Sequence, residues 1–280
     1  MATTALTRWR NGGVAAVLLG ALLWILLTSE NSLPAPVPVT LPADLAKVPS
    51  DAVFLASVRL ADLWKGDFSR SVRQKYDKEI NEGASREFEN KFGLPINQVE
   101  RLTLVGLKVV GPAEPLFFVG TVKAYDRDRV IAAGEKGKEE KYKGQTFYVK
   151  GKDWAVYPLD KRALVYGKPG DIRVLIDHPA KQDGNLAAAL RLAAGKYAEV
   201  FAANLKAIND AVGAKLPGEA KSFKPLLQAR YGTLTLDVDK EIRADVRLIF
   251  AGDKDAKAAV EPARAALEVG VGSAFAPPRE

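Results

Sequence analysis

An uncharged apolar stretch near the N-terminus constrains this chain more than any other feature. From Gly12 to Thr28 the sequence reads GGVAAVLLGALLWILLT, with no charged side chain. A helix needs about 17 to 25 apolar residues to cross the hydrocarbon core of a bilayer, so this segment reaches the lower limit. The segment is apolar all round, whereas a helix at the surface of a soluble core would carry a polar stripe. We therefore expect residues 12–28 to form a transmembrane anchor.

The charges that flank this segment predict its orientation. Arg8 and Arg10 precede it, and no Lys or Arg follows until Lys47. Positive charge at the end of a spanning helix stays in the cytoplasm, so residues 1–11 are expected inside and the rest of the chain outside a bacterial inner membrane, in the periplasm or an equivalent compartment. A signal peptide cleaved on secretion is the alternative, but the residues after Leu27 lack an A-x-A-like cleavage site, which favours a retained signal-anchor.

A proline-rich spacer follows the apolar segment, over residues 29–49. Proline fixes φ and removes an N–H, so this composition favours extended polyproline II. At about 3.1 Å per residue, the stretch from Leu33 to Val48 would span roughly 50 Å. The spacer predicts that the folded part stands away from the membrane. Its prolines are Pro34, Pro36, Pro38, Pro42 and Pro49.

Composition removes several classes of function. The chain has no Cys, which excludes disulfides, thiolate metal sites, a cysteine nucleophile and a lipidated cysteine. Its net charge of +7 comes from interspersed charges of both signs, as in EKGKEEKYKG from Glu135 to Gly144. Such a pattern is typical of a solvated face, so we expect no nucleic-acid partner, while attraction to an anionic polymer stays open.

Two parts of the chain resemble one another. VFLASVRLADL from Val53 aligns without gaps with VFAANLKAIND from Val200, and ERLTLVGLKV from Glu100 resembles ARYGTLTLDV from Ala229. The similarity predicts an internal duplication of a strand-helix-strand-strand-helix unit.

The end of each copy carries a further match. KAYDRDRVIAA from Lys123 and FAGDKDAKAAV from Phe250 each place a D-x-D before a helical run. We expect Asp126 and Asp253 to be N-caps, because a short carboxylate accepts the free amide protons of a helix's first turn.

The predicted fold class is α+β, with a mixed or antiparallel sheet and helices on one face. A helix is expected from near Ala61 toward Phe92, and residues 144–168, GQTFYVKGKDWAVYPLDKRALVYGK, predict a three-stranded meander. The predicted extents are 50–268 for one extracytoplasmic domain, 52–136 and 198–268 for its repeat-like halves, 137–197 for the meander insertion and 269–280 for a flexible tail.

The sequence contains no motif that identifies a reaction. It has no Walker A pattern, G-x-S-x-G elbow, H-E-x-x-H, or G-x-G-x-x-G between a strand and a helix. The single histidine, His178, precedes a proline and is interpreted as a capping or turn residue. The DVDKE stretch from Asp237 lacks the Gly and the final Glu of a calcium loop. We therefore predict no catalytic, cofactor-binding or metal-binding residues and no cofactor.

Aromatic residues in the meander form a speculative ligand surface. Tyr148, Trp154, Tyr157 and Tyr166 could stack on a sugar if they share one exposed face. The alternative is that they belong to the core, where most strand aromatics lie. Solvent exposure separates the two hypotheses.

The layout resembles the singly membrane-anchored secreted proteins of planctomycete-type bacteria. The resemblance rests on the apolar segment, the spacer and PSDAVFLASVRLADLW from Pro49 to Trp64, about the first quarter of the chain. That group implies no activity, so no functional residue is carried over.

These features together predict a membrane-anchored extracytoplasmic binding or scaffolding protein. Its expected partners are the membrane, through the N-terminal helix, and an envelope protein or anionic polymer. The alternative is a hydrolase of cell-wall or polysaccharide material, whose carboxylates would come from distant strands. A third hypothesis is a structural domain that assembles through a sheet edge.

Overall fold

The structure is a computed structural model that describes residues 40–65, 85–109, 114–178, 183–212, 218–238 and 242–274. No helix within these ranges is long and apolar enough to cross a membrane. The predicted anchor at 12–28 lies outside them, as does the spacer up to residue 39.

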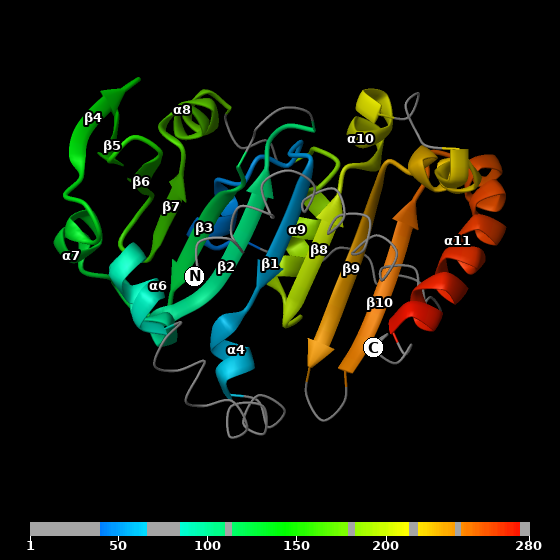
Figure 1. Cartoon of the computed structure of the whole chain (residues 1–280), viewed down its shortest axis with the longest axis horizontal. Coiled ribbons are helices and arrows are strands. Elements are labelled where there is room, and N and C mark those ends of the chain that lie inside the picture. The colour runs from blue at the N-terminus through cyan, green and yellow to red at the C-terminus, as the bar shows by residue number, and fades with distance from the viewer. Residues whose placement is uncertain are drawn as a thin grey trace, which may run out of the picture.

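One antiparallel sheet of ten strands organises the described part of the chain (Figure 1). The strand order is β10-β9-β8-β1-β2-β3-β7-β6-β5-β4. Every pair of neighbours is antiparallel, which settles the choice left open between a mixed and an antiparallel sheet. The strands are β1 Phe54–Val58, β2 Val99–Gly106, β3 Leu116–Thr121, β4 Lys138–Tyr142, β5 Gln145–Lys150, β6 Trp154–Pro158, β7 Ala163–Gly167, β8 Glu199–Ala203, β9 Tyr231–Val238 and β10 Ile242–Ile249.

Helices connect these strands. They are α3 Ala43–Ala46, α4 Leu60–Lys65, α6 Ser85–Phe92, α7 Arg127–Ala132, α8 Pro169–Asp177, α9 Ala187–Ala194, α10 Leu205–Val212 and α11 Asp253–Ala274, with 3-10 segments η2 Ile96–Gln98 and η4 Gly218–Gln228. Asp126 caps α7 as predicted, since its Oδ1 accepts a hydrogen bond from the Arg129 amide at 3.0 Å, whereas Asp253 is the first residue of α11 and not its N-cap. The helix expected from Ala61 toward Phe92 is seen as α4 and α6, and residues 66–84 between them lie outside the description.

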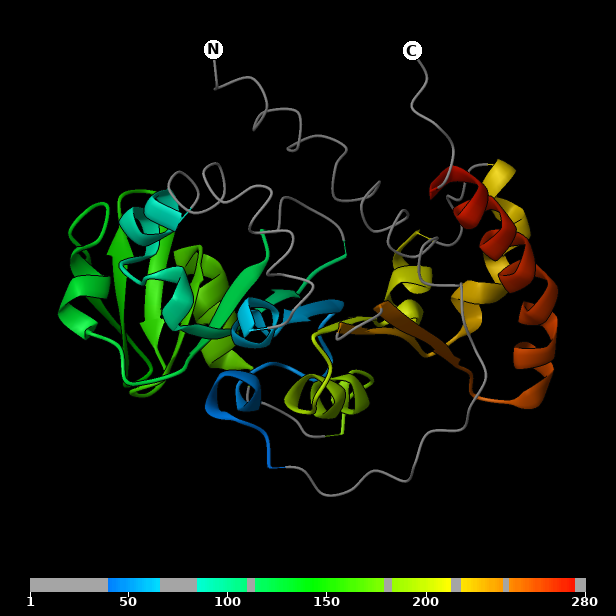
Figure 2. The same cartoon turned by 90° about the horizontal axis from the view of Figure 1, so that it is seen from below.

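Strand alternation gives the sheet two faces, each with its own helices. Leu55 points to the face covered by α3, α8 and α9, here called the α9 face. Phe54 and Ala56 point to the other, here called the α6 face, where α6 and α7 pack on β3, β7 and β6. Helices therefore lie on both sides of the sheet, and the prediction that they cover one face was wrong (Figure 2). The reason is that these strands carry apolar residues on both faces, and each apolar face must be buried.

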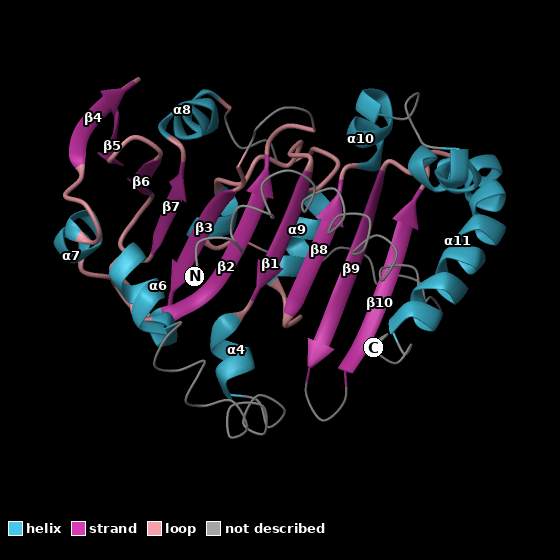
Figure 3. Ribbon diagram, in the orientation of Figure 1, coloured by secondary structure: helices cyan, strands magenta, loops and turns pink. Residues whose placement is uncertain are grey.

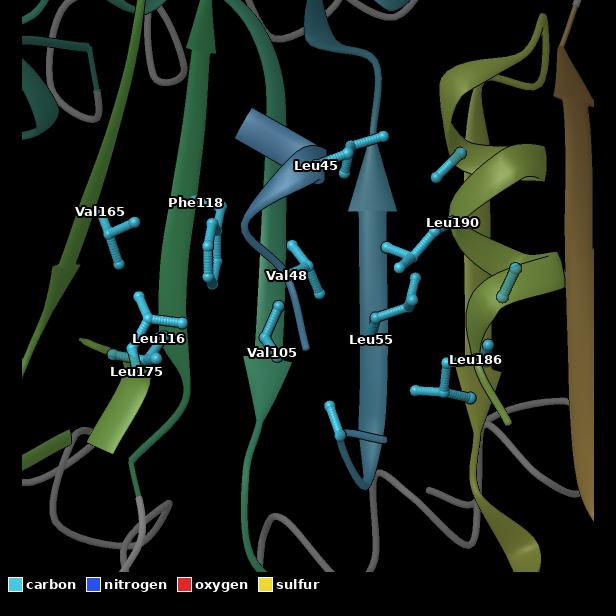
Figure 4. Close-up of a cluster of buried hydrophobic side chains, with 14 of the residues drawn as sticks. Leu45, Val48, Leu55, Val105, Leu116, Phe118, Val165, Leu175, Leu186 and Leu190 are labelled. Carbon is cyan, nitrogen blue, oxygen red and sulfur yellow. The ribbon is translucent and has the colours of Figure 1, made fainter. Parts of the chain in front are cut away.

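The main core lies on the α9 face (Figure 4). Leu55, Val105 and Phe118 from three neighbouring strands belong to the same buried cluster as Leu190 of α9, and all four are no more than 2% exposed. Leu45 of α3, which the sequence placed in the spacer, is also fully buried in this cluster. The spacer therefore gives way to packed structure several residues before position 49.

The meander has one strand more than predicted. β5, β6 and β7 are the expected strands, and β4 adds a fourth at the edge of the sheet. Its sequence, KEEKY, has no apolar alternation, because an edge strand exposes most of its side chains and charge there discourages pairing with other chains. At the other end of the chain, α11 continues to Ala274, past the start of the tail expected at 269.

Candidate functional site

The four aromatic residues of the predicted ligand surface are divided between the two faces. Tyr148 and Tyr166 both lie opposite Val156 in the sheet, on the α6 face. Trp154 shares that face, because it is two residues from Val156. Tyr157 points the other way and packs in the α9-face core. The four rings therefore do not form one platform.

Three of these side chains make contacts within the domain that give them a structural role. The Tyr166 hydroxyl donates a hydrogen bond to the Phe92 carbonyl, the residue is 2% exposed, and burial raises the pKa of its phenol. The Trp154 ring lies 4.9 Å from Lys91 Nζ. The Tyr157 hydroxyl donates to Gln145 Oε1 at 3.0 Å, and burial raises its pKa as well. These contacts belong to the packing of the meander.

His178 ends helix α8, as the sequence indicated. Its amide donates to the Val174 carbonyl at 3.1 Å, and its Nδ1 lies 2.8 Å from the same oxygen. The side chain is thus bonded to its own helix. Within the described ranges, no three His, Asp or Glu side chains are grouped as a metal site requires.

A more distinctive surface lies at the centre of the sheet on the α6 face, and we call it the central patch. It is made of three cross-strand rows that run over β2, β1, β8, β9 and β10. The rows are Gly106, Phe54, Ala203, Gly232 and Leu248; then Leu104, Ala56, Phe201, Leu234 and Val246; then Leu102, Val58, Glu199, Leu236 and Ala244.

The patch is apolar at every position but one. Glu199 is the single charged residue among its fifteen members. Alternation sends the other charged side chains of β9 and β10 to the α9 face, where Arg247 Nε donates to Asp245 Oδ1 at 2.7 Å. The middle of the sheet is therefore apolar on a side where the chain would ordinarily place polar residues, unless something covers it.

The described helices border this patch, and the side chains on its β9 and β10 strands pack on other patch residues. Leu234 and Val246 pack against Phe201, Leu236 and Ala244, all of which are patch residues. On the β10 side, Leu248 contacts side chains of η4, α10 and α11. On the other side, α6 and α7 pack over β3, β7 and β6. Figure 3 shows α6 and α11 at opposite margins of this region.

Burial differs between the two sides of β1, β2 and β8. Leu55, Val105 and Val200 on the α9 face are at most 1% exposed. On the patch side of these strands, Phe54, Leu104 and Phe201 are only half-buried, whereas Leu234 and Val246 on β9 and β10 are 3% and 5% exposed. An apolar surface that stays half-buried in a soluble domain is typical of a binding surface.

Glu199 has an unusual setting for a carboxylate. It lies between Val58 on β1 and Leu236 on β9 in the sheet. Burial among these apolar neighbours raises its pKa. Within the patch no basic residue is present to pair with it. The charged form is therefore disfavoured in the isolated chain and would be favoured by a cation brought from outside.

The sequence contained a signal for this surface that is visible only with the strand register. Phe54, Ala56 and Val58 alternate on one strand, and Leu234 and Leu236 alternate on another. Each run predicts a strand. Neither shows that the two runs align on the same face, because that depends on how strands far apart in sequence pair.

Comparisons with known proteins find no matching family model and no matching curated protein. Among solved structures, the chain is similar to TP0453 of Treponema in crystal form III, with 11% identity over 81% of this chain and 86% of that one and a TM-score of 0.44. Crystal form IV gives 9% identity over 73% and 79%, also with a TM-score of 0.44. Likeness at this level assigns neither a family nor a function.

Proposed function

We propose that this chain is a binding protein that holds an apolar partner on the central patch. The observation that carries the proposal is the patch itself: fourteen uncharged positions and one carboxylate, continuous over five strands and bordered by helices. A partner that covered it would remove the exposed parts of half-buried side chains such as Phe54 and Leu104 from water, which is worth about 25 cal/mol per Å² of apolar surface.

Binding fits the patch better than hydrolysis. Cleavage of a glycosidic bond needs two carboxylates on opposite sides of the substrate, about 5 to 10 Å apart. The patch presents Glu199 without a second acidic residue on its three rows. The surface is suited to holding a partner, and a hydrolase would have to use another part of the molecule.

We place this binding surface outside a bacterial inner membrane, with residues 12–28 as the anchor and residues 1–11 in the cytoplasm. The support is the apolar run and the charge bias of Arg8 and Arg10. The spacer would join the sheet at α3, where Leu45 is buried. An anchored arrangement holds the patch at a defined distance from the bilayer.

We also infer that the two repeat-like halves arose by duplication and jointly build the patch. From β1 and from β8 onward, the described elements follow the same order of one strand, two or more helical segments, two strands and a helix. The alignment of Val53 with Val200 makes Leu55 equivalent to Ala202, and these two residues lie opposite each other where β1 pairs with β8. Equivalent strands that pair antiparallel relate the halves by an approximate two-fold, as in a symmetric dimer.

The register also refines this alignment. Leu55 lies opposite Val105, and Ala202 lies opposite Thr233, so Val105 is equivalent to Thr233. The sequence comparison had matched Val105 with Leu234, one residue further on. Because a one-residue shift reverses the faces of a strand, the structural register is the one that matters for the patch.

The experiment that tests the binding proposal is photolabelling with a small apolar probe, 3-trifluoromethyl-3-phenyldiazirine, on the full chain in lipid nanodiscs. Mass spectrometry then locates adducts residue by residue, which separates patch labelling from labelling of lipid or of residues 12–28. We expect adducts to concentrate on β1, β8 and β9. Phe201→Asp should reduce them at least fivefold because it adds charge to the middle row.

Two exposed apolar residues outside the patch supply matched controls. Val122 is 49% exposed and Val260 is 50% exposed. Substitution of either by Asp should leave the labelling of the patch unchanged. Labelling of the patch no stronger than that around Val260 would refute the binding proposal.

A further inference from the structure

The central patch is about as wide as two helices packed side by side. Neighbouring strands lie about 4.8 Å apart, so five strands present roughly 20 to 24 Å. A helix with its side chains is about 10 to 12 Å across. Leu248, at one margin, already contacts the helical segments η4, α10 and α11. The half-buried part of the middle row, Leu104, Ala56 and Phe201, lies on three neighbouring strands and is about as wide as one helix.

Elsewhere in the structure, helices pack on both faces of this sheet. On the α9 face, Leu190 and Ala193 of α9 pack against Leu55 and Val200. On the α6 face, Phe92 of α6 contacts Tyr166 of β7, with ring centroids 4.8 Å apart. Apolar side chains from helices therefore cover both flanks of the patch and its reverse side. A helix on the patch would complete the layer.

Resting on the proposed function, we propose that the partner is an amphipathic helix of another protein whose apolar side carries one Lys or Arg, and that this cation pairs with Glu199. Glu199 stands alone among apolar residues, opposite Val58 and Leu236. A wholly apolar partner would bury this carboxylate without a hydrogen bond, which is costly. An acidic partner would add repulsion. A helix with a single cation in its apolar stripe would give Glu199 a hydrogen-bond partner and would not repel it.

A strand is a poorer occupant for this surface. Peptide strands bind by adding to the edge of a sheet, where backbone groups are unpaired. Four of the five patch strands, β2, β1, β8 and β9, have a strand neighbour on both sides, and the edge strand β10 packs against η4 and α11 through Leu248. The patch thus offers side chains and not backbone, which is the situation in which amphipathic helices are recognised.

The test uses the full chain in nanodiscs, a cross-linker on the patch and designed peptide probes. Phe201→p-benzoylphenylalanine places the photoreactive group in the middle row. Two 18-residue helical peptides of Leu, Ala and Gln differ at one position in the apolar stripe, which holds Lys in one and norleucine in the other. A third peptide carries the Lys on its polar side as a control. The cross-link yield against peptide concentration gives the half-saturation point for each.

We expect the peptide with Lys in the stripe to half-saturate at about a tenfold lower concentration than the norleucine peptide, which corresponds to one charge-assisted hydrogen bond. In the Glu199→Gln background this preference should disappear, because the amide keeps the shape of the side chain and removes its charge. The peptide with Lys on its polar side should behave like the norleucine peptide on both backgrounds.

Each contrary result has its own meaning. Equal half-saturation of the two stripe peptides on Glu199 would overturn the assigned cation and leave the binding proposal standing. Failure of every peptide to cross-link, while diazirine labelling of the patch persists, would overturn the helical partner. A cross-link from position 201 to residues 12–28, to a second copy or to lipid would replace the partner protein with that occupant. Loss of the diazirine labelling itself would instead refute the proposed function.

Discussion

Asp44 and Arg101 form an ion pair inside the protein, with Arg101 Nη1 3.0 Å from Asp44 Oδ2 and each side chain 4% exposed. Asp44 belongs to α3, the first described helix, and Arg101 belongs to β2 in the centre of the sheet. Gly120 on β3 lies opposite Arg101, and a Cβ at that position would be 2.8 Å from Asp44 Oδ2. The pair therefore ties the end of the spacer to the sheet, in a space that a glycine keeps open.

Removal of one partner of this pair should be severe. Asp44→Asn or Arg101→Met leaves a buried charge alone, and we expect each to lower the free energy of unfolding by about 3 to 5 kcal/mol. The double substitution Asp44→Leu with Arg101→Met should cost clearly less than the sum, because neither charge remains. Urea unfolding of the three variants measures this. Additive costs would show that the two side chains do not depend on each other.

Gly120→Ala should also destabilise the fold, by about 1 to 3 kcal/mol, because the added methyl group meets the Asp44 carboxylate. Gly170 in α8 is the matched control, since a Cβ there has no atom within 4 Å. Gly170→Ala should be neutral or stabilising, because alanine loses less backbone entropy in a helix. Thermal unfolding of the two variants would contradict the packing argument if they shifted the midpoint alike.

Glu199→Gln should stabilise the protein near neutral pH in the absence of a partner. Burial raises the pKa of Glu199 in the folded state, so the ionised form carries a cost that is present above that pKa and is relieved as the pH falls and the group becomes protonated. The gain at pH 7 should be at most about 1 kcal/mol, because the side chain is only half-buried and water screens its charge. Denaturation curves at pH 7 and pH 4 should differ between variant and native chain only at the higher pH. A gain that persists at pH 4 would point to a different cause.

Tyr166→Phe should lower the free energy of unfolding by about 1 to 2 kcal/mol, because it leaves the partly buried Phe92 carbonyl without the hydroxyl that donates to it. Tyr148→Phe is the control on the same face. The Tyr148 hydroxyl accepts a hydrogen bond from Arg127 Nη2 at an exposed site, so its loss should be within about 0.5 kcal/mol. Equal losses in the two variants would mean that the Phe92 contact contributes little.

Local sequence signals predicted many elements of the fold. The alternation of Leu234 and Leu236 with polar residues predicts a hairpin over residues 233–239 and 242–250, and β9 and β10 form it within two residues of these limits. Asp126 caps α7 because an aspartate before a helical run satisfies free amides nearby in sequence. β4 was missed because its side chains, KEEKY, lie on an edge strand that buries little.

The central patch could not be read from the sequence in the same way. Its rows join Leu104 to Ala56, then to Phe201 and on to Leu234, residues that are brought together by pairing of distant strands. The sequence alone does not distinguish Glu199 from a surface carboxylate, and only the strand register shows that Val58 and Leu236 lie beside it. The aromatic residues of the meander, such as Tyr166, instead pack within the domain.

The sequence by itself determined the class of fold, the position of most strands and helices and the apolar character of residues 12–28, because each of these depends on residues close together along the chain. Only the tertiary structure decided the order of the ten strands, the presence of helices on both faces and the isolation of Glu199. These features depend on which distant strands pair and in which register. A shift of one residue would have turned every side chain of a strand to the opposite face.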